Sequence, residues 1–273
     1  MKLFLTILAC LALTQAAEIR YEEIVSVRDA QMRQKDTRIV NGHPAPAGRF
    51  PYQVHLTGFT NAGALSCGGS VISSTWVLTA AHCQVNVNSF NIILGSHLRN
   101  APYQTRTSAQ IVIHPNYNPN NLNNDIGLIR MGTPVTLGGN IHAVRIPHHG
   151  TSHTIPGSRA TVSGWGLTCQ GTGCVIPNEM RWVDMSIISN AQCAQTYGNA
   201  VIIGSTICAL GADAINQNPC SGDSGGPLTY GGTQVGVVSF VAAAGCASGL
   251  PSGYVRTESF TNWIESHTGH LPR

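Results

Sequence analysis

The sequence predicts an all-β fold made of two β-rich halves and closed by one short helix. Runs of β-branched and aromatic residues, separated by Gly, Pro and Asn, recur from residue 39 onward. In the first half the predicted strands lie at residues 52–56, 69–72, 76–78, 90–94, 110–113 and 126–129. Strands that follow one another so closely are typical of a barrel or a sandwich.

The second half repeats this pattern after a connection rich in Gly, Pro and His. Its predicted strands lie at residues 159–163, 180–185, 234–239 and 253–255. We therefore place the first half at about residues 39–134, the connection at about 135–158 and the second half at about 159–273. Only the C-terminal end predicts a helix, capped by Thr257, because Phe260, Trp263, Ile264 and His267 share one helical face.

The N-terminus has the features of a secretory signal, which we assign to residues 1–16. One positive charge is followed by a short apolar run and by small residues before a cleavage position after Ala16. This run is too short to span a bilayer, and no later stretch reaches the roughly 20 apolar residues that a membrane helix needs. Residues 17–38 are polar, of mixed charge, and free of cysteine and of apolar periodicity, so we expect a removable propeptide before a domain at residues 39–273.

The composition argues against a nucleic-acid partner and for an oxidising compartment. Charged residues make up 10% of the chain and the formal net charge is +3, unlike the dense basic surface of nucleic-acid-binding proteins. Cys10 leaves with the signal, and an even set of remaining cysteines in a secreted chain predicts four disulfides. No close cysteine pair recurs with histidine at zinc-ligand spacing, so we expect neither a metal nor a cofactor.

Three separated motifs supply the groups of a nucleophilic triad. They are TAAHC with His82, NDIGL with Asp125 and GDSGG with Ser224. A serine hydroxyl is a poor nucleophile at neutral pH unless a base removes its proton, and a neutral imidazole is such a base. A carboxylate on the other ring nitrogen fixes the tautomer of the histidine. These residue types therefore predict Ser224 as nucleophile, His82 as general base and Asp125 as its partner.

Together with IVNG from residue 39, GWG from Gly164 and the full CSGDSGGP from Cys220, these motifs resemble the chymotrypsin family of serine endopeptidases. The resemblance runs from residue 39 to about residue 267. It implies two six-stranded antiparallel β-barrels with the active site in the cleft between them. It also implies an oxyanion hole formed by the amides of Gly222 and Ser224.

The resemblance further implies that the chain is made as a zymogen. A cut after Arg38 would free the amine of Ile39, which would pair with the buried carboxylate of Asp223. That ion pair would bring the loop at Gly222 into register and complete the oxyanion hole. Because the propeptide contains no cysteine, it would be released rather than stay attached by a disulfide.

Three disulfides are carried over from the resemblance: Cys67–Cys83, Cys193–Cys208 and Cys220–Cys246. Cys169 and Cys174 depart from the common pattern of the family, and we expect them to pair with each other. The alternative is a bond to another molecule. A disulfide that closes so short a loop contributes about 2 kcal/mol in the chain-entropy model.

By resemblance, the pocket that selects the side chain before the scissile bond has its base at Asn218 and its walls at Val241 and Ser252. An uncharged base argues against trypsin-like cleavage, because a buried Arg or Lys would have no partner. Val241 narrows the pocket toward small or medium apolar residues, as in elastases, whereas a more open loop would admit Phe and Tyr, as in chymotrypsin. Ser239 matches the serine that hydrogen-bonds the triad acid and begins the segment along which substrate pairs; the alternative is a plain strand serine.

The second half resembles most the brachyurin-like digestive enzymes of arthropods, some of which open collagen. We therefore expect a secreted, monomeric endopeptidase of the gut lumen that cuts protein or peptide substrates after uncharged apolar residues. Its expected partners are an activating trypsin-like protease and proteinaceous inhibitors. Two alternatives stay open: a cascade protease of defence or clotting, and a non-catalytic serine-protease homologue that acts by binding. The lack of a cysteine-rich domain before Arg38 disfavours the first, and the complete triad disfavours the second.

Overall fold

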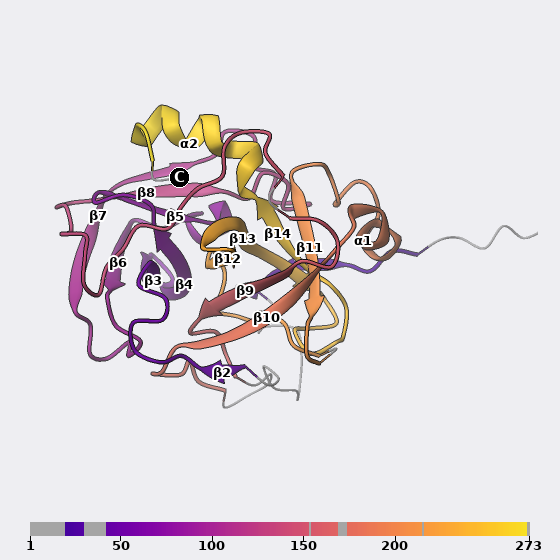
Figure 1. Cartoon of the computed structure of the whole chain (residues 1–273), viewed down its shortest axis with the longest axis horizontal. Coiled ribbons are helices and arrows are strands. Elements are labelled where there is room, and N and C mark those ends of the chain that lie inside the picture. The colour runs from indigo at the N-terminus through magenta and orange to yellow at the C-terminus, as the bar shows by residue number, and fades with distance from the viewer. Residues whose placement is uncertain (1–19, 30–41, 153, 169–173, 215, 272–273) are drawn as a thin grey trace, which may run out of the picture.

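Two closed β-barrels form the body of the chain in this computed structural model, which describes residues 20–29, 42–152, 154–168, 174–214 and 216–271 (Figure 1). The first barrel has six antiparallel strands in the order β3-β4-β5-β8-β7-β6. Their bounds are β3 Gln53–Thr60, β4 Gly63–Val71, β5 Trp76–Thr79, β6 Ser89–Leu94, β7 Gln104–Ile113 and β8 Gly127–Met131. The predicted all-β class is confirmed.

The second barrel closes through a pairing between β13 and β14, the two ends of its strand order. Its six strands follow the order β13-β12-β9-β10-β11-β14. Their bounds are β9 Arg159–Gly164, β10 Arg181–Ile188, β11 Thr206–Gly211, β12 Pro227–Tyr230, β13 Thr233–Ala242 and β14 Ser252–Arg256. The local sequence pattern had not singled out β11 or β12, but the six strands implied by the resemblance require both.

Each barrel has its own apolar core, built from alternate residues of its strands. On β3, Val54 and Leu56 are fully buried inside the first barrel. On β10, Val183, Met185 and Ile187 point into the second barrel, while the residues between them are partly exposed. Such alternation is what a closed sheet with one inner face requires. The two cores therefore leave a seam between the barrels, where the polar motifs of the sequence lie.

Two short strands that precede the first barrel join the second barrel instead. They are β1 (Ile24–Ser26), which pairs with β13, and β2 (His43–Pro44), which pairs with β10. Residues 17–38 show no apolar periodicity that would predict a strand, yet Ile24–Ser26 form one. Residues 24–27 read Ile-Val-Ser-Val, and their β-branched side chains favour an extended backbone that pairs with the exposed edge of β13.

The structure has two α-helices among the described residues, of which one was predicted. The C-terminal helix α2 (Thr261–Thr268) follows a 3₁₀ turn at Thr257–Phe260, so Thr257 lies inside that turn and is not the N-cap. The helix α1 (Asn190–Tyr197) was not predicted, because only Cys193 and Tyr197 are buried and the apolar period is weak. Its N-cap is Ser189, whose side chain accepts a hydrogen bond from the backbone N–H of Gln192.

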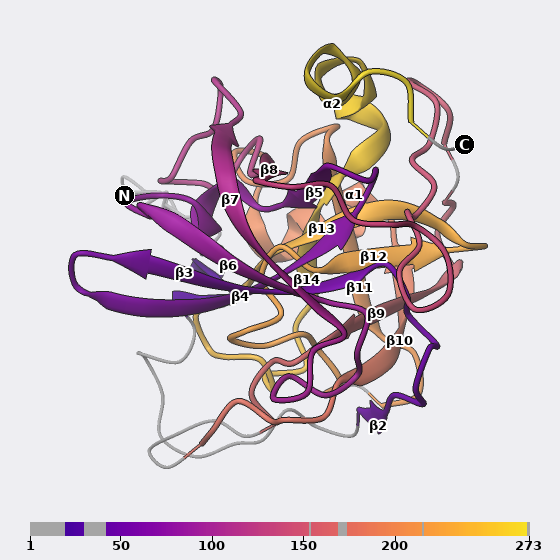
Figure 2. The same ribbon diagram turned by 90° about the vertical axis from the view of Figure 1, so that its left-hand side faces the viewer.

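Although α2 follows the second barrel in sequence, it packs on the first (Figures 1 and 2). Phe260 and Ile264 belong to the apolar cluster that fills the first barrel. The ring of His114 contacts those of Phe260 and Trp263, with centroids 5.0 Å and 4.9 Å apart. The end of the chain therefore crosses from one barrel to the other.

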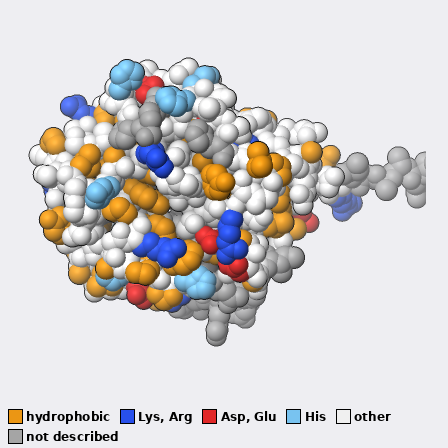
Figure 3. All heavy atoms as spheres, viewed as in Figure 1, with side chains coloured by type: hydrophobic (Ala, Val, Ile, Leu, Met, Phe, Trp, Pro, Cys, Tyr) orange, Lys and Arg blue, Asp and Glu red, His pale blue; other side chains and the backbone are white. Residues whose placement is uncertain are grey.

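The three disulfides implied by the resemblance are present: Cys67–Cys83, Cys193–Cys208 and Cys220–Cys246. Cys174 is also disulfide-bonded, while its expected partner Cys169 lies outside the described residues. Within those residues, no helix is long and apolar enough to cross a membrane. On the face shown in Figure 3 the described Arg side chains are scattered rather than gathered into a basic patch.

Candidate active site

His82 and Asp125 are brought together by the pairing of two neighbouring strands. His82 lies in a single turn directly after β5, and Asp125 directly precedes Ile126 and β8, which pairs with β5. His82 Nδ1 lies 2.7 Å from Asp125 Oδ2, and the backbone N–H of His82 donates to Asp125 Oδ1 at 2.8 Å. Both side chains are buried. The carboxylate therefore fixes both the ring and the backbone of the histidine.

Asp125 is also held from the second barrel. Ser239, in β13, donates its hydroxyl to Asp125 Oδ2 at 2.6 Å. The hydrogen bond that the sequence predicted for this serine is therefore present, and Ser239 is not a plain strand serine. Oδ2 accepts hydrogen bonds from both the imidazole and this hydroxyl, so the carboxylate is held from both barrels.

Ser224 lies near His82 but belongs to the second barrel. It lies in the turn before β12, is fully buried, and accepts a hydrogen bond at its carbonyl from the backbone N–H of Gly68 at 2.7 Å. The Sγ of Cys83 lies 3.8 Å from His82 Nε2 and 3.5 Å from the carbonyl oxygen of Ser224, so serine and imidazole are neighbours. The Oγ of Ser224 has no hydrogen-bond partner among the described residues. A hydrogen bond between a nucleophile and its base is often long in the free protein and tightens only when a ligand is bound.

The backbone around Ser224 depends on glycine at two places. Gly222 and Gly225 have φ angles of +104° and +77°, and a Cβ on Gly225 would collide with Thr79. The carbonyl of Ser221 accepts from the N–H of Leu167 at 2.8 Å, so the N–H of the same peptide unit, that of Gly222, points the opposite way. Neither this amide nor that of Ser224 donates to another described residue.

Comparison with known proteins gives the family of this site. The family model described as Trypsin matches residues 39–264. A collagenase of Hypoderma lineatum is 38% identical over 86% of this chain and 89% of its own length, and a brachyurin of Leptuca pugilator is 38% identical over 86% of this chain and 100% of its own. The chain belongs to the trypsin family. A solved structure titled HL collagenase, with a TM-score of 0.76 and 36% identity, covers 85% of this trypsin-family chain and 99% of its own.

The resemblance seen in the sequence is thereby confirmed. This trypsin-family protein is a serine endopeptidase with the two-barrel fold of that family. His55, which is also buried, is not part of the site: its Nε2 lies 2.9 Å from Ser66 Oγ, and burial lowers its pKa to about 4.

In this trypsin-family structure Asp223 points into the protein beside the GWG motif. Its Oδ1 accepts from the N–H of Gly166 at 2.7 Å, and its Oδ2 accepts from the N–H of Cys220 at 3.0 Å. Burial raises the pKa of this carboxyl to about 6, although the two backbone donors oppose the rise. Arg38 and Ile39 lie outside the described residues, but Gly42 lines a small cavity beside Asp223. The pairing of an Ile39 amine with Asp223 stays a prediction.

This burial predicts a pH-dependent stability of the uncut chain. A folded-state pKa of about 6, against an ordinary value of 3.8, means that the contribution of Asp223 is fully present below pH 3.8 and is lost as the pH rises through 6. The free energy of unfolding therefore falls by about 3 kcal/mol at most over this pH range. After cleavage, pairing with the Ile39 amine should lower this pKa and remove the loss. Melting temperatures measured from pH 4 to pH 8 should thus diverge between uncut and cut chains as the pH rises.

The control for this measurement is Arg38→Ala, in which no trypsin cut frees the Ile39 amine, so after the same treatment its melting temperature should still fall with rising pH as in the uncut chain. Equal pH profiles for the uncut and cut wild-type chains would contradict the pairing of Asp223 with the new amine.

The four residues predicted to form the substrate pocket of this trypsin-family protein, Asn218, Ser239, Val241 and Ser252, are all buried. Asn218 Nδ2 donates to the carbonyls of Cys246 and Leu250 at 3.1 Å and 3.0 Å. The hydroxyl of Ser252 lies 2.8 Å from that of Tyr254. The Oδ1 of Asn218 is buried and has no partner among the described residues. Asn218 therefore ties the loop between β13 and β14 in place and adds no charge.

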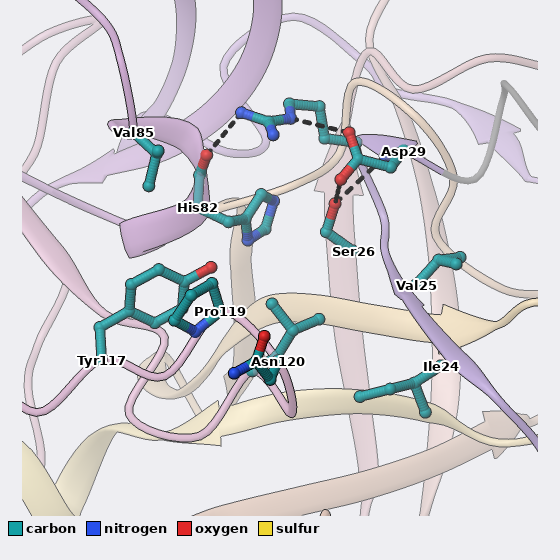
Figure 4. A pocket seen from close by; sticks show the side chains of 11 residues that line it. Ile24, Val25, Ser26, Asp29, His82, Val85, Tyr117, Pro119 and Asn120 are labelled. Atoms are coloured by element: carbon teal, nitrogen blue, oxygen red, sulfur yellow. Dashed lines mark hydrogen bonds and ion pairs between the residues drawn. The ribbon is translucent and has the colours of Figure 1, made fainter.

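The segment that occupies the cleft was not predicted from the sequence. Figure 4 shows residues of β1 together with His82 around one cavity. The N–H of Val27 donates to the carbonyl of Ser239 at 2.9 Å, and its carbonyl accepts from the hydroxyl of Ser221 at 2.9 Å. Arg28 Nη1 donates to the carbonyl of His82 at 2.7 Å. The β-branched run at residues 24–27 was a usable signal, hidden by the charged residues on both sides of it.

Proposed function

We propose that this trypsin-family protein is a secreted endopeptidase, made as a zymogen, that cuts peptide bonds after uncharged apolar residues. The observation that carries the proposal is the His82–Asp125 pair, fixed by two hydrogen bonds, beside the buried hydroxyl of Ser224. The groups come from three different segments and two barrels, and a purely structural role explains neither the buried imidazole nor the unpartnered hydroxyl.

In the proposed reaction Ser224 Oγ attacks the carbonyl carbon of the scissile bond while His82 Nε2 takes its proton. Asp125 keeps the proton of the neutral ring on Nδ1 and stabilises the imidazolium that forms. The amides of Gly222 and Ser224 donate to the developing oxyanion, and each such donor contributes about 3 kcal/mol to lowering the barrier. His82 then gives its proton to the leaving amine, and water repeats the sequence on the acyl-enzyme.

The specificity proposal rests on the neutral pocket base. Asn218 directs its amide donors at two carbonyls, so a charged side chain entering the pocket would find no carboxylate. Val241, 1% exposed, lies on β13 in the apolar cluster that also contains Cys220 and Cys246. Small to medium apolar side chains fit both observations.

A digestive role in the gut lumen is supported by the N-terminal signal and by the names of the relatives. A collagenase of Hypoderma lineatum and a brachyurin of Leptuca pugilator are similar over most of this chain. We propose an activating trypsin-like protease and proteinaceous inhibitors as partners, because the family acts on protein substrates. No observation favours a cascade role over digestion.

The test is to secrete the chain, activate it with trypsin, remove the trypsin and profile a peptide library. We expect cleavage after Leu, Val and Ala, and little after Arg or Lys. Ser224→Ala, treated identically, is the matched control and reports residual trypsin. A preference for Arg or Lys would overturn the pocket assignment, and an inactive wild type would favour a non-catalytic homologue.

A further inference from the structure

We propose that residues 22–29 are a built-in inhibitor of the cleft, and that the same peptide binds the cut enzyme in trans. This inference rests on the proposed function, because it takes residues 17–38 as the segment removed on activation. It goes beyond that function, since cleavage after Arg38 would release a ligand as well as an amine.

The main chain of this segment binds as an added strand. Ile24, Val25 and Ser26 pair antiparallel with Ala242, Val241 and Phe240 of β13. The pairing continues at both ends of β1: the N–H of Ala243 donates to the carbonyl of Glu23 at 2.8 Å, and the N–H of Val27 donates to the carbonyl of Ser239 at 2.9 Å. Addition of a strand to a free sheet edge is a general way of binding an extended peptide.

Two side chains of the segment are buried by the second barrel. Val25 is 7% exposed and Val27 is fully buried. Both belong to the apolar cluster that contains Val241 and the disulfide Cys220–Cys246. Val27 follows the strand and contacts the loop that carries Ser224, and its side chain is of the size and polarity that the neutral pocket should accept.

The residues on either side of the peptide bond between Val27 and Arg28 contact the two segments that carry Ser224 and His82. On one side the carbonyl of Val27 contacts the hydroxyl of Ser221, three residues before Ser224. On the other side Arg28 contacts the carbonyl of His82. In Figure 4 Ser26 and Asp29 stand across the cavity from Tyr117, and His82 lies between them. With this segment in place, no second peptide can pair with the same edge of β13.

The turn that follows explains why the segment inhibits rather than serving as a good substrate. Ser26 Oγ donates to Asp29 Oδ2 at 2.6 Å, and the N–H of Asp29 lies 3.2 Å from Ser26 Oγ. This closes a turn around Val27 and Arg28. The carbonyl of Val27 is bonded to the hydroxyl of Ser221 and not to the amides of Gly222 or Ser224, which are the proposed oxyanion donors.

The experiment adds a synthetic peptide of residues 20–29 to the trypsin-activated enzyme, freed of its own propeptide by gel filtration. We expect competitive inhibition of a chromogenic substrate, seen as a higher apparent KM at unchanged kcat. The peptide with Val27→Asp should inhibit at least about a hundredfold more weakly, because it buries an unpaired carboxylate. The matched control is Glu22→Gln, which changes an exposed side chain and should leave the inhibition constant within about twofold.

A second variant tests the turn. The peptide with Ser26→Ala keeps the strand but loses both contacts to Asp29, so we expect it to be cut faster than the wild-type peptide at the bond after Val27. Mass spectrometry of the digest identifies the bond. Cleavage at other bonds alone would contradict the observed register.

Two outcomes would overturn the inference: equal inhibition by the wild-type and Val27→Asp peptides, or none by the wild type at about 1 mM. Failure of the proposed function is distinguishable, because titration calorimetry with trypsin-cut Ser224→Ala measures peptide binding without activity. An enzyme that cuts the library but does not bind the peptide refutes this inference alone. A chain that binds the peptide but cuts nothing refutes the proposed function alone.

Discussion

Asp125→Asn should lower kcat by about 10⁴-fold, which is the loss in the reference Ser-His-Asp protease of this same family. The carbonyl oxygen of the introduced amide can still accept from the backbone N–H of His82, which leaves the NH₂ group facing His82 Nδ1. The ring then carries its proton on Nε2 and can no longer accept the proton of Ser224. Activity of the trypsin-treated variant on the preferred library substrate measures the loss, and its melting temperature shows whether the fold is retained.

The matched control is Ser239→Ala, which removes one donor to Asp125 but keeps the charge and the histidine tautomer. We expect it to cost at most about a hundredfold in kcat, the value of one hydrogen bond to a charged group. If Asp125→Asn kept more activity than Ser239→Ala, Asp125 would not be the partner that orients His82.

Arg38→Ala should yield a folded, secreted protein that trypsin cannot activate. Position 38 precedes every strand of both barrels in the sequence, so we expect the melting temperature to be unchanged. Trypsin can still cut after Arg28, Arg33 or Lys35, but none of these cuts frees the amine of Ile39. Without that amine Asp223 keeps only its two backbone donors. We therefore expect activity no higher than that of Ser224→Ala, measured after trypsin treatment and N-terminal sequencing.

Arg38→Lys is the matched control, because trypsin still cuts after lysine and should activate it fully. If purified Arg38→Ala had peptidase activity while its N-terminus lay before residue 39, the amine of Ile39 would not be needed for activity. A chain with both Arg38→Ala and Val27→Asp separates the effect of the missing Ile39 amine from the effect of residues 22–29 in the cleft. Opening the cleft alone should not restore activity.

The triad could be predicted from sequence because its chemistry requires particular residue types within recognisable local motifs. Ser239 could be predicted as well, because the resemblance to the family extends to this position. The direction of the Asn218 amide could not, because it depends on the carbonyls of Cys246 and Leu250, which lie 28 and 32 residues further along the chain. The sequence gives the identity of each side chain directly, whereas the partners of that side chain depend on the tertiary structure.

The helix α1 and the strand β1 escaped prediction for different reasons. In α1 only Cys193 and Tyr197 are buried, so the apolar period is weak, although the cap at Ser189 was readable. In β1 the apolar run is too short to stand out from a charged segment, and its structure comes from the edge of β13. Short elements of this kind are stabilised by what they pack against rather than by their own propensities.

The segment at Phe260 and α2 links the two barrels, because it follows the second barrel in sequence and packs on the first. His82 and Asp125 belong to one barrel and Ser224 to the other. The distance between Ser224 and His82 therefore depends on the relative position of the two barrels. The packing of Phe260 and Ile264 into the first barrel ties the end of the second barrel to it. Catalytic alignment in this enzyme therefore draws part of its rigidity from Phe260 and Ile264, whose side chains belong to the core of the first barrel and not to the catalytic site.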